Sequence, residues 1–318
     1  MSESQPESKV QFIELSEEES GQRLDNYLMR ILGGVPKTRI YKAIRTGEVR
    51  INKGRAKPER KLNAGDVIRI PPIAVAAREE GRRVPDRWSQ RIDRSIIHND
   101  SELMVIDKPT GLAVHGGSGV QFGLIESLRQ MFPDQRYMEL VHRLDRDTSG
   151  LVMIAKRASV LRELHALLRG DGVDKRYLAL VVGKWPAYRA RVEASLEKSA
   201  LPSGERIVRV TPEGRRSLTE FRVIERYRGA TLVEAKPVTG RTHQIRVHAQ
   251  HAGHPILGDT KYGSEEQLVL AKAHGLKRLF LHAQRLEFRL GGRPYRFEAP
   301  LDDELSTVCD SFGTKSSG

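Results

Sequence analysis

The chain has 318 residues, a single cysteine and a net charge of +13 at pH 7. This length predicts about two or three domains, and one cysteine excludes both an intramolecular disulfide and a zinc finger built on several cysteines. No stretch approaches the roughly 18 consecutive apolar residues of a membrane-spanning helix, and the polar start of the chain lacks the apolar segment of a secretory signal. We therefore expect a soluble cytoplasmic protein whose basic surface binds a polyanion.

Residues 1–20 are polar and acidic, and we expect a flexible tail with a short strand possible in VQFIEL. A small domain is predicted over residues 21–72. Apolar residues at helical spacing in RLDNYLMRIL predict a first helix. A second helix is expected in PKTRIYKAIRT, with Gly47 as its C-terminal cap. Short strands follow, the first two separated by a turn at NKG and the last formed by DVIRI.

Basic residues are concentrated in this small domain. Residues 21–72 contain 13 lysines and arginines against 4 acidic residues. On the second helix Arg39, Lys42 and Arg45 recur every three residues, apart from the apolar face. Such point charges suit the phosphates of a nucleic acid, which set its affinity more than its sequence preference. We expect these three side chains to bind RNA.

The pattern changes after the small domain. Residues 73–92 mix charges with little periodicity and predict a linker. From residue 93 to residue 305, many short β-like runs follow one another with few helical stretches between them. This pattern predicts an α+β domain with a mixed, largely antiparallel sheet rather than a doubly wound parallel one. Helices are expected in ASVLRELHALLRG and RTHQIRVHAQHAG, and residues 306–318 are expected to form a C-terminal tail.

Two further patterns lack a feature that their best-known function requires. HGGSGVQFG at residues 115–123 is glycine-rich, but no G-K-[ST] follows, which favours a tight turn over a nucleotide-binding loop. Several histidines raise the alternative of a metal-dependent RNA hydrolase: His142, His243, His248, His251 and His254. No HExxH occurs, and the last four do not align on one helix face. We predict no metal.

The stretch HRLDRDTSG at residues 142–150 alternates cations and carboxylates beside a predicted strand. Burial alone would raise the pKa of a carboxylate there, whereas a nearby guanidinium lowers that pKa and keeps the group charged. Arg241 and Arg246 in GRTHQIRVH are the candidate partners. One reactive carboxylate without a Ser–His pair or a cofactor motif suits a reaction that needs neither redox nor water, such as an isomerisation. These residues alone leave a solvated turn and a metal site open as alternatives.

Several motifs in a fixed order connect the chain to a known family. HRLDRDTSGL, KRYLALV and PVTGRTHQIRVH, preceded by IDKPTGLAVHGG and followed by LHA, resemble the RluA family of RNA pseudouridine synthases over about residues 95–300. Residues 21–72 resemble the S4-type RNA-binding domain. GVPKTRIY and HGGSG are similar to the group that acts on large-subunit ribosomal RNA. The resemblance implies a pseudouridine synthase fold, 23S ribosomal RNA or its precursor as the partner, and no metal or small-molecule cofactor.

The resemblance also implies catalytic roles. In the family motif HRLDxxTSG the reactive aspartate directly follows the leucine, which makes it Asp145 and leaves Asp147 at a variable position. Tyr177 matches the tyrosine that stacks against the flipped base. Arg246 matches the arginine that pairs with the reactive aspartate. The residues leave open whether Asp145 attacks C1′, adds to C6 or acts through a glycal.

Two further arginines are expected to contact the RNA. Arg143 matches the family residue that fills the space left by the flipped nucleotide, and Arg241 is expected to contact phosphate. Extruding a base costs a few kcal/mol, and stacking on an aromatic ring returns about 1–3 kcal/mol. A non-catalytic RNA-binding factor for ribosome assembly is the alternative function. A monomer is expected, because no heptad pattern argues for a larger assembly.

Overall fold

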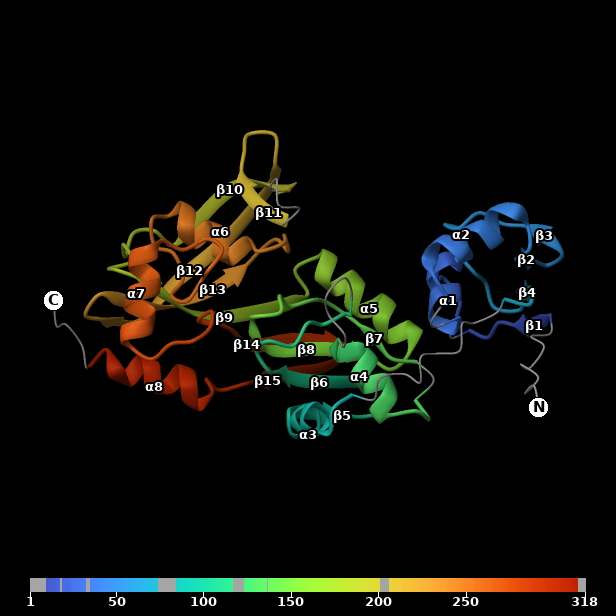
Figure 1. Ribbon diagram of the computed structural model, residues 1–318, viewed down its shortest axis with the longest axis horizontal. Helices are drawn as coiled ribbons and strands as arrows, with labels where there is room; N and C mark the ends of the chain where they lie inside the picture. Colours follow the sequence, from blue (N-terminus) through green and yellow to red (C-terminus); the bar gives the residue numbers. More distant parts are fainter. Residues whose placement is uncertain are drawn as a thin grey trace, which may run out of the picture. The chain divides into compact units, whose positions relative to one another are not determined.

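The computed structural model describes residues 10–17, 19–32, 35–73, 84–116, 123–135, 137–200 and 206–313. The chain divides into two compact units at Pro85, whose elements are labelled in Figure 1. Most of the glycine-rich stretch at 115–123 lies outside the described residues, so its turn stays a prediction. No helix among the described residues is long and apolar enough to cross a membrane.

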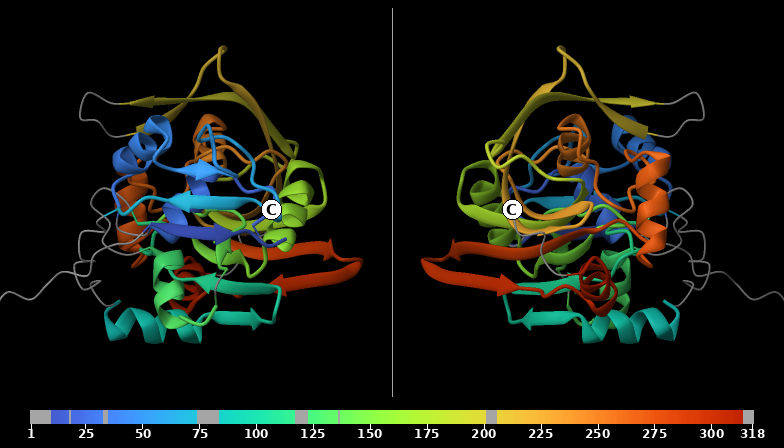
Figure 2. Two further views of the ribbon diagram at one scale, coloured as in Figure 1. Left: turned by 90° about the vertical axis from the view of Figure 1, so that its right-hand side faces the viewer. Right: turned by 90° about the vertical axis from the view of Figure 1, so that its left-hand side faces the viewer.

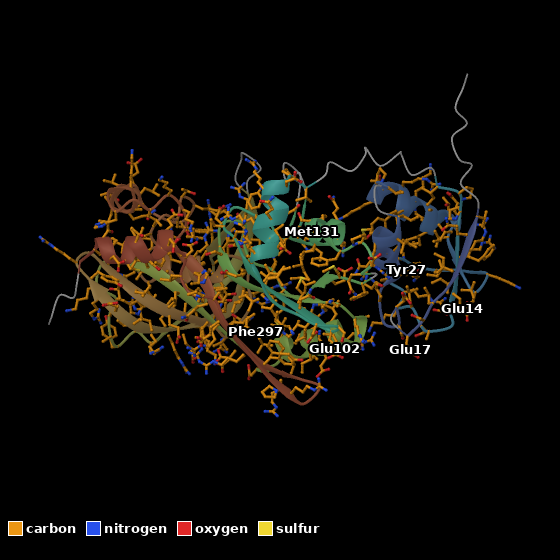
Figure 3. The ribbon with its side chains drawn as sticks, turned by 90° about the horizontal axis from the view of Figure 1, so that it is seen from below. Glu14, Glu17, Tyr27, Glu102, Met131 and Phe297 are labelled. Atoms are coloured by element: carbon orange, nitrogen blue, oxygen red, sulfur yellow. The ribbon has the colours of Figure 1, made fainter. Side chains whose placement is uncertain are left out.

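The first unit combines two helices with a small antiparallel sheet. Its elements are β1 (Gln11–Glu14), α1 (Leu24–Ile31), α2 (Lys37–Thr46), β2 (Arg50–Ile51), β3 (Gly54–Arg55) and β4 (Val67–Ile70). The strands lie in the order β1-β4-β2-β3. Apolar residues of both helices, among them the buried Tyr27 labelled in Figure 3, form one core with Ile51 and Ile68 of the sheet.

Local sequence explains the turns of this unit. The predicted cap of α2 is confirmed, because Gly47 adopts a left-handed conformation with φ of 77°. Asn52 and Lys53 also have positive φ, as a two-residue type I′ hairpin between β2 and β3 requires. The possible strand in the acidic start of the chain is present as β1, which pairs with β4. The sheet therefore begins before residue 21, where the small domain was expected to start.

The second unit contains one large sheet with helices on both sides. Its strands are β5 (Ile96–Asn99), β6 (Leu103–Lys108), β7 (Glu139–Leu140), β8 (Ser149–Ala155), β9 (Val173–Val182), β10 (Arg191–Ala200), β11 (Arg206–Val210), β12 (Arg215–Tyr227), β13 (Ala230–Pro237), β14 (Leu281–Leu290) and β15 (Arg293–Glu298). Its helices are α3 (Asp86–Arg94), α4 (Leu124–Met131), α5 (Ala158–Arg169), α6 (Gln244–His251), α7 (Glu265–Ala273) and α8 (Asp303–Ser311).

The sheet follows the order β11-β10-β12-β13-β9-β14-β8-β6-β5, with β15 on β14 and β7 on β8. Among the described strands, β14 and β8 form the one parallel pair. The predicted mixed, largely antiparallel sheet is therefore confirmed. Figure 2 shows the β14–β15 hairpin extending beyond its neighbours.

The centre of the sheet is buried on both faces. Along β6, Met104 and Ile106 join one core with α3 and α4. The alternate residues Leu103 and Val105 join a second core with α5. Continuous apolar runs such as LMVI and GLVMIA follow from this double coverage, because both sets of alternating side chains must be apolar. The covered centre is what holds the loops at the ends of β8 and β9 in place.

Two short helices lie where less structure was expected. Helix α3 occupies the second half of the expected linker, and its Ile92 is fully buried. Helix α8 extends into the expected C-terminal tail and buries Leu305 and Val308. Both helices have mostly polar sequences with few apolar positions, so their packing could not be read from periodicity. Helices α4 and α7 were likewise missed, whereas the expected helices α5 and α6 are present.

Candidate active site

Three separate elements bring the predicted catalytic residues together. Asp145 lies in the loop before β8, Tyr177 in β9 and Arg246 in α6. They line one pocket of about 280 Å³. Arg143 and Arg241 line the same pocket and are exposed. All five site residues that were predicted in this unit therefore line the same pocket.

The loop that carries Asp145 is held by a buried lysine. Lys108, at the end of β6, is fully buried. Its Nζ donates hydrogen bonds to the carbonyl oxygens of Pro109 (3.0 Å), Leu112 (2.9 Å) and Arg146 (3.1 Å). The backbone N–H of Gly111 also donates to the Arg146 carbonyl at 2.9 Å. The IDKPTGL stretch thus fixes the backbone directly after Asp145.

Because of Lys108, we expect the free energy of unfolding to rise with pH between about pH 7 and 10.5. Burial lowers the pKa of Lys108 from 10.5 to about 7, against the opposing charges of Asp147 and Asp145. Between these values the unfolded chain binds a proton that the folded chain has released, so rising pH favours the folded state. The three hydrogen bonds of Nζ belong to the ammonium form, and the neutral amine that replaces it keeps two N–H donors for the same carbonyl oxygens. Chemical denaturation at several pH values in this range measures the rise. It should be smaller in Lys108→Met, and an equal rise in both proteins would contradict the assignment.

The two aspartates of the loop have different surroundings. Asp145 Oδ2 lies 3.4 Å from Arg246 Nη1 and 3.6 Å from His243 Nε2, and the side chain is 20% exposed. Asp147 is 46% exposed and pairs with the exposed Arg146. The carboxylate in the pocket is therefore that of Asp145, whereas Asp147 lies on the surface of the loop.

Arg246 has a second partner that was not predicted. Its Nε and Nη2 donate to the two carboxylate oxygens of Asp259 at 2.7 and 2.8 Å. Asp259 is 1% exposed, and the Arg246 guanidinium lies over the Tyr262 ring at 4.9 Å. Burial opposes the charge of Arg246, but the hydrogen bonds to Asp259 and the charges of Asp259 and Asp145 raise its pKa. Asp259 therefore orients the group that faces Asp145, and no motif marks it in the sequence.

His243 also lies close to the Asp145 carboxylate. It precedes α6 with φ of 53°, a conformation that is uncommon for residues other than glycine. Its Nδ1 lies 2.7 Å from the Tyr262 hydroxyl, which accepts a hydrogen bond from the Val208 N–H. If the hydroxyl donates to Nδ1, all these groups are satisfied and the ring proton is on Nε2, facing Asp145. Burial lowers the pKa of His243, which favours this neutral form.

Tyr177 forms the aromatic wall of the pocket. Strand pairing places it between Ala235 of β13 and Ala283 of β14, and all three residues belong to one buried core. Ala283 belongs to the LHA motif. Burial, and then the charge of Asp145, raises the pKa of the Tyr177 hydroxyl. The side chain is therefore a neutral phenol at physiological pH.

Three histidines of GRTHQIRVHAQHAGH, namely His243, His248 and His254, have separate hydrogen-bond partners. His248 Nε2 lies 2.8 Å from the Ser217 hydroxyl, and burial lowers the pKa of His248 to about 4. His254 Nδ1 lies 2.8 Å from the Val182 carbonyl oxygen. Within the described residues, no group of three or more His, Cys, Asp or Glu side chains is arranged to hold a metal ion.

The predicted RNA-binding residues of α2 belong to the first unit and differ among themselves. Arg39 forms an ion pair with Glu48 at 2.7 Å. Lys42 and Arg45 are exposed on the same helix. Their charges are therefore presented to solvent, whereas that of Arg39 is partly neutralised.

Comparisons with known proteins match each unit to a known family. A family model described as RNA pseudouridylate synthase matches residues 102–251, and the S4 domain model matches residues 22–68. Ribosomal large subunit pseudouridine synthase C of Haemophilus influenzae is 52% identical over 304 residues, covering 95% of this chain and 94% of that one. The Escherichia coli K12 protein of the same name is 53% identical over 302 residues, covering 93% and 94%.

Two solved human structures resemble this one. Human RNA pseudouridylate synthase domain containing 4 has a TM-score of 0.59 at 25% identity, covering 73% of this chain and 97% of that one. Human RNA pseudouridylate synthase domain containing 1 has a TM-score of 0.54 at 25% identity, and the match covers 65% of this chain and 82% of that one. With its S4 domain and its close relatives among the large-subunit enzymes, the chain belongs to the RluA family of RNA pseudouridine synthases.

Proposed function

We propose that the chain isomerises specific uridines of 23S (large-subunit) ribosomal RNA, or of its precursor, to pseudouridine in the pocket around Asp145. The observation that carries the proposal is that Asp145 is the one carboxylate among the described residues that line this pocket. Relatives more than half identical along nearly the whole chain are named ribosomal large subunit pseudouridine synthase C, which supports the RNA class.

The reaction needs only what the pocket provides. The N1–C1′ bond of uridine breaks and a C5–C1′ bond forms, while C5 loses a proton and N1 gains one. Product and substrate are isomers, so no water is consumed and no electron is transferred. We assign Asp145 as the group that acts on the sugar or base as the glycosidic bond breaks. Arg246, held by Asp259, orients the Asp145 carboxylate and keeps its charge balanced.

The remaining side chains of the pocket are suited to a flipped nucleotide. We assign Tyr177 to stacking on the extruded uracil, which offsets part of the cost of unstacking. Arg143 and Arg241 are exposed at the pocket. We assign Arg143 to the space that the nucleotide leaves and Arg241 to a phosphate. The protein would act in the cytoplasm as a monomer of 35.8 kDa. Light scattering of the purified protein tests the monomeric state.

Tyr177→Ala should slow pseudouridine formation more than Tyr177→Phe. The alanine variant loses the stacking surface, worth about 1–3 kcal/mol, or roughly 5- to 150-fold in rate. The phenylalanine variant keeps the ring and should retain most of that stabilisation. Single-turnover rates at saturating RNA measure both. Equal loss in the two variants would show that the hydroxyl, and not stacking, is what the reaction requires.

Lys42→Ala and Arg45→Ala should weaken RNA binding and make it less dependent on salt. Each lost phosphate contact reduces the slope of log affinity against log salt by about 0.7–0.9. Arg39→Ala should have a smaller effect, because Glu48 already pairs with that guanidinium. Filter binding of ribosomal RNA across a salt series measures all three. Unchanged affinity and slope in the first two variants would mean that the α2 surface does not contact RNA.

Unmodified 23S ribosomal RNA incubated with the protein and EDTA tests the proposed function. Pseudouridines are mapped afterwards as reverse-transcription stops at carbodiimide adducts. Stops at discrete uridines in intact RNA are expected. Bound but unmodified RNA would instead indicate a non-catalytic assembly factor. RNA cleaved without EDTA and protected by it would indicate a metal-dependent hydrolase.

A further inference from the structure

We propose that the outer face of the β1-β4-β2-β3 sheet binds a single-stranded segment of the RNA substrate, as a second contact surface on the first unit. The inference rests on the proposed function, since it takes RNA as the substrate. It concerns the sheet, which lies outside the basic surface of α2 that the sequence predicted. Figure 1 shows these strands in blue and cyan.

Strand register places an aromatic residue and three arginines in one row. Phe12 pairs with Arg69, Arg69 with Arg50, and Arg50 with Arg55, across all four strands. Residues directly opposite each other in a sheet project from the same face. The neighbouring row, which includes Ile68, is buried in the core. The row of Phe12 and the arginines therefore projects outward, and Phe12 is 68% exposed.

Two arginines of this face, Arg50 and Arg69, are oriented by backbone carbonyl groups. Arg69 Nη1 donates to the Glu48 carbonyl oxygen at 2.7 Å, and Arg50 Nε donates to that of Gly47 at 3.1 Å. Neutral carbonyl groups orient a guanidinium without neutralising it. Within the described part of the first unit, no ion pair joins Arg50, Arg55 or Arg69 to a carboxylate.

The face is also preorganised around a groove. The groove has a volume of about 750 Å³ and is lined by Phe12, Gly47, Arg50, Asn52, Lys53, Val67 and Arg69. The turn that carries Lys53 is fixed by its neighbour: Asn52 Nδ2 donates to Asp66 Oδ1 at 2.7 Å, and Asn52 Oδ1 accepts from the Val67 N–H at 2.8 Å. Little ordering is therefore needed when a ligand binds.

An exposed ring beside oriented cations is suited to single-stranded RNA. Bases stack on aromatic side chains while cations follow the phosphates, whereas a duplex keeps its bases stacked inside and offers no free face to Phe12. An acidic peptide would satisfy the arginines but would not provide a planar partner for the ring. Glu14, labelled in Figure 3, lies on the same strand face as Phe12, opposite Val67. Replacing Glu14 provides a control, because the loss of its negative charge should strengthen the binding of an anion to this face.

Fluorescence anisotropy of labelled oligouridine, alone and in a duplex with oligoadenosine, tests the proposal with the full chain across a salt series. Phe12→Ala should weaken binding of the single strand about 5- to 10-fold without changing the salt slope. Arg50→Gln and Arg69→Gln should each reduce the slope by about 0.7. Glu14→Gln should bind at least as tightly as the unaltered chain. Thermal unfolding of each variant checks that the sheet is intact.

Phe12→Trp provides an independent readout if Phe12→Ala destabilises β1. The new indole should be quenched when oligouridine binds, because a base stacks on it. Unchanged affinity and slope in the Phe12 and arginine variants, or no added quenching in Phe12→Trp, would overturn the proposal. Loss of binding to polyglutamate with RNA binding intact would assign the face to an acidic protein, which also overturns it. Pseudouridine mapping with the unaltered chain tests the proposed function separately, so the two failures are distinguishable.

Discussion

Asp145→Asn should abolish pseudouridine formation while leaving most RNA binding intact. The amide has nearly the shape of the carboxylate, but it is a poor nucleophile and a poor base, so the reaction loses its reactive group. Binding is expected to survive because phosphates contribute most of the affinity of such proteins and Asp145 carries no positive charge. Single-turnover assays should show a rate reduced by at least about 10⁴-fold, of the order seen when a reactive group is removed.

Asp147→Asn is the matched control for this change. It alters the same chemical group two residues along the same loop, on a side chain that is 46% exposed and paired with Arg146. Its rate should remain within about tenfold of that of the unaltered chain. Activity in the Asp145 variant, or complete loss in the Asp147 variant, would contradict the choice of carboxylate.

Asp259→Asn should have the second-largest effect, on stability and rate together. Arg246 is nearly buried, and its bidentate partner would lose its charge. Breaking a buried ion pair in this way costs about 3–5 kcal/mol of folding stability. Arg246 would also be free to move relative to Asp145, and small misplacements can reduce a rate roughly 100-fold. Chemical denaturation and single-turnover rates measure the two effects.

A double variant distinguishes positioning from general destabilisation. Replacing both partners, as in Arg246→Met with Asp259→Asn, removes the buried charges together and should restore much of the stability. The asparagine oxygen can still accept hydrogen bonds from the backbone N–H groups of Lys261 and Tyr262, which Asp259 Oδ1 accepts now. The double variant should not restore activity, since Asp145 then lacks its oriented cation. Recovery of activity along with stability would show that the Arg246–Asp259 pair serves only the fold.

The sequence was sufficient for features that depend on local pattern. The continuous apolar runs of β6 and β8, the helix of α6 and the glycine cap at Gly47 each follow from spacing and residue type. The pocket residues Asp145, Tyr177 and Arg246 were identified by their motifs. Their meeting in space depends on a sheet order that brings together residues 101 positions apart, which periodicity does not reveal.

Features that depend on tertiary contact were missed for a physical reason. Asp259 stands in an ordinary loop sequence, and only its 1% exposure and two bonds to Arg246 reveal its role. The proton position on His243 depends on Tyr262, nineteen residues away. Helix α8 lies in a polar segment whose few apolar residues pack on a core built earlier in the chain.

Release of tritium from RNA labelled at C5 of uridine tests the central claim most directly. Forming the C5–C1′ bond expels the hydrogen at C5, so each conversion releases one tritium to water while the RNA chain stays intact. With EDTA present, the unaltered chain and Asp147→Asn should release tritium from discrete uridines, and Asp145→Asn should release none above background. Release by Asp145→Asn at a rate comparable to the unaltered chain would contradict the account.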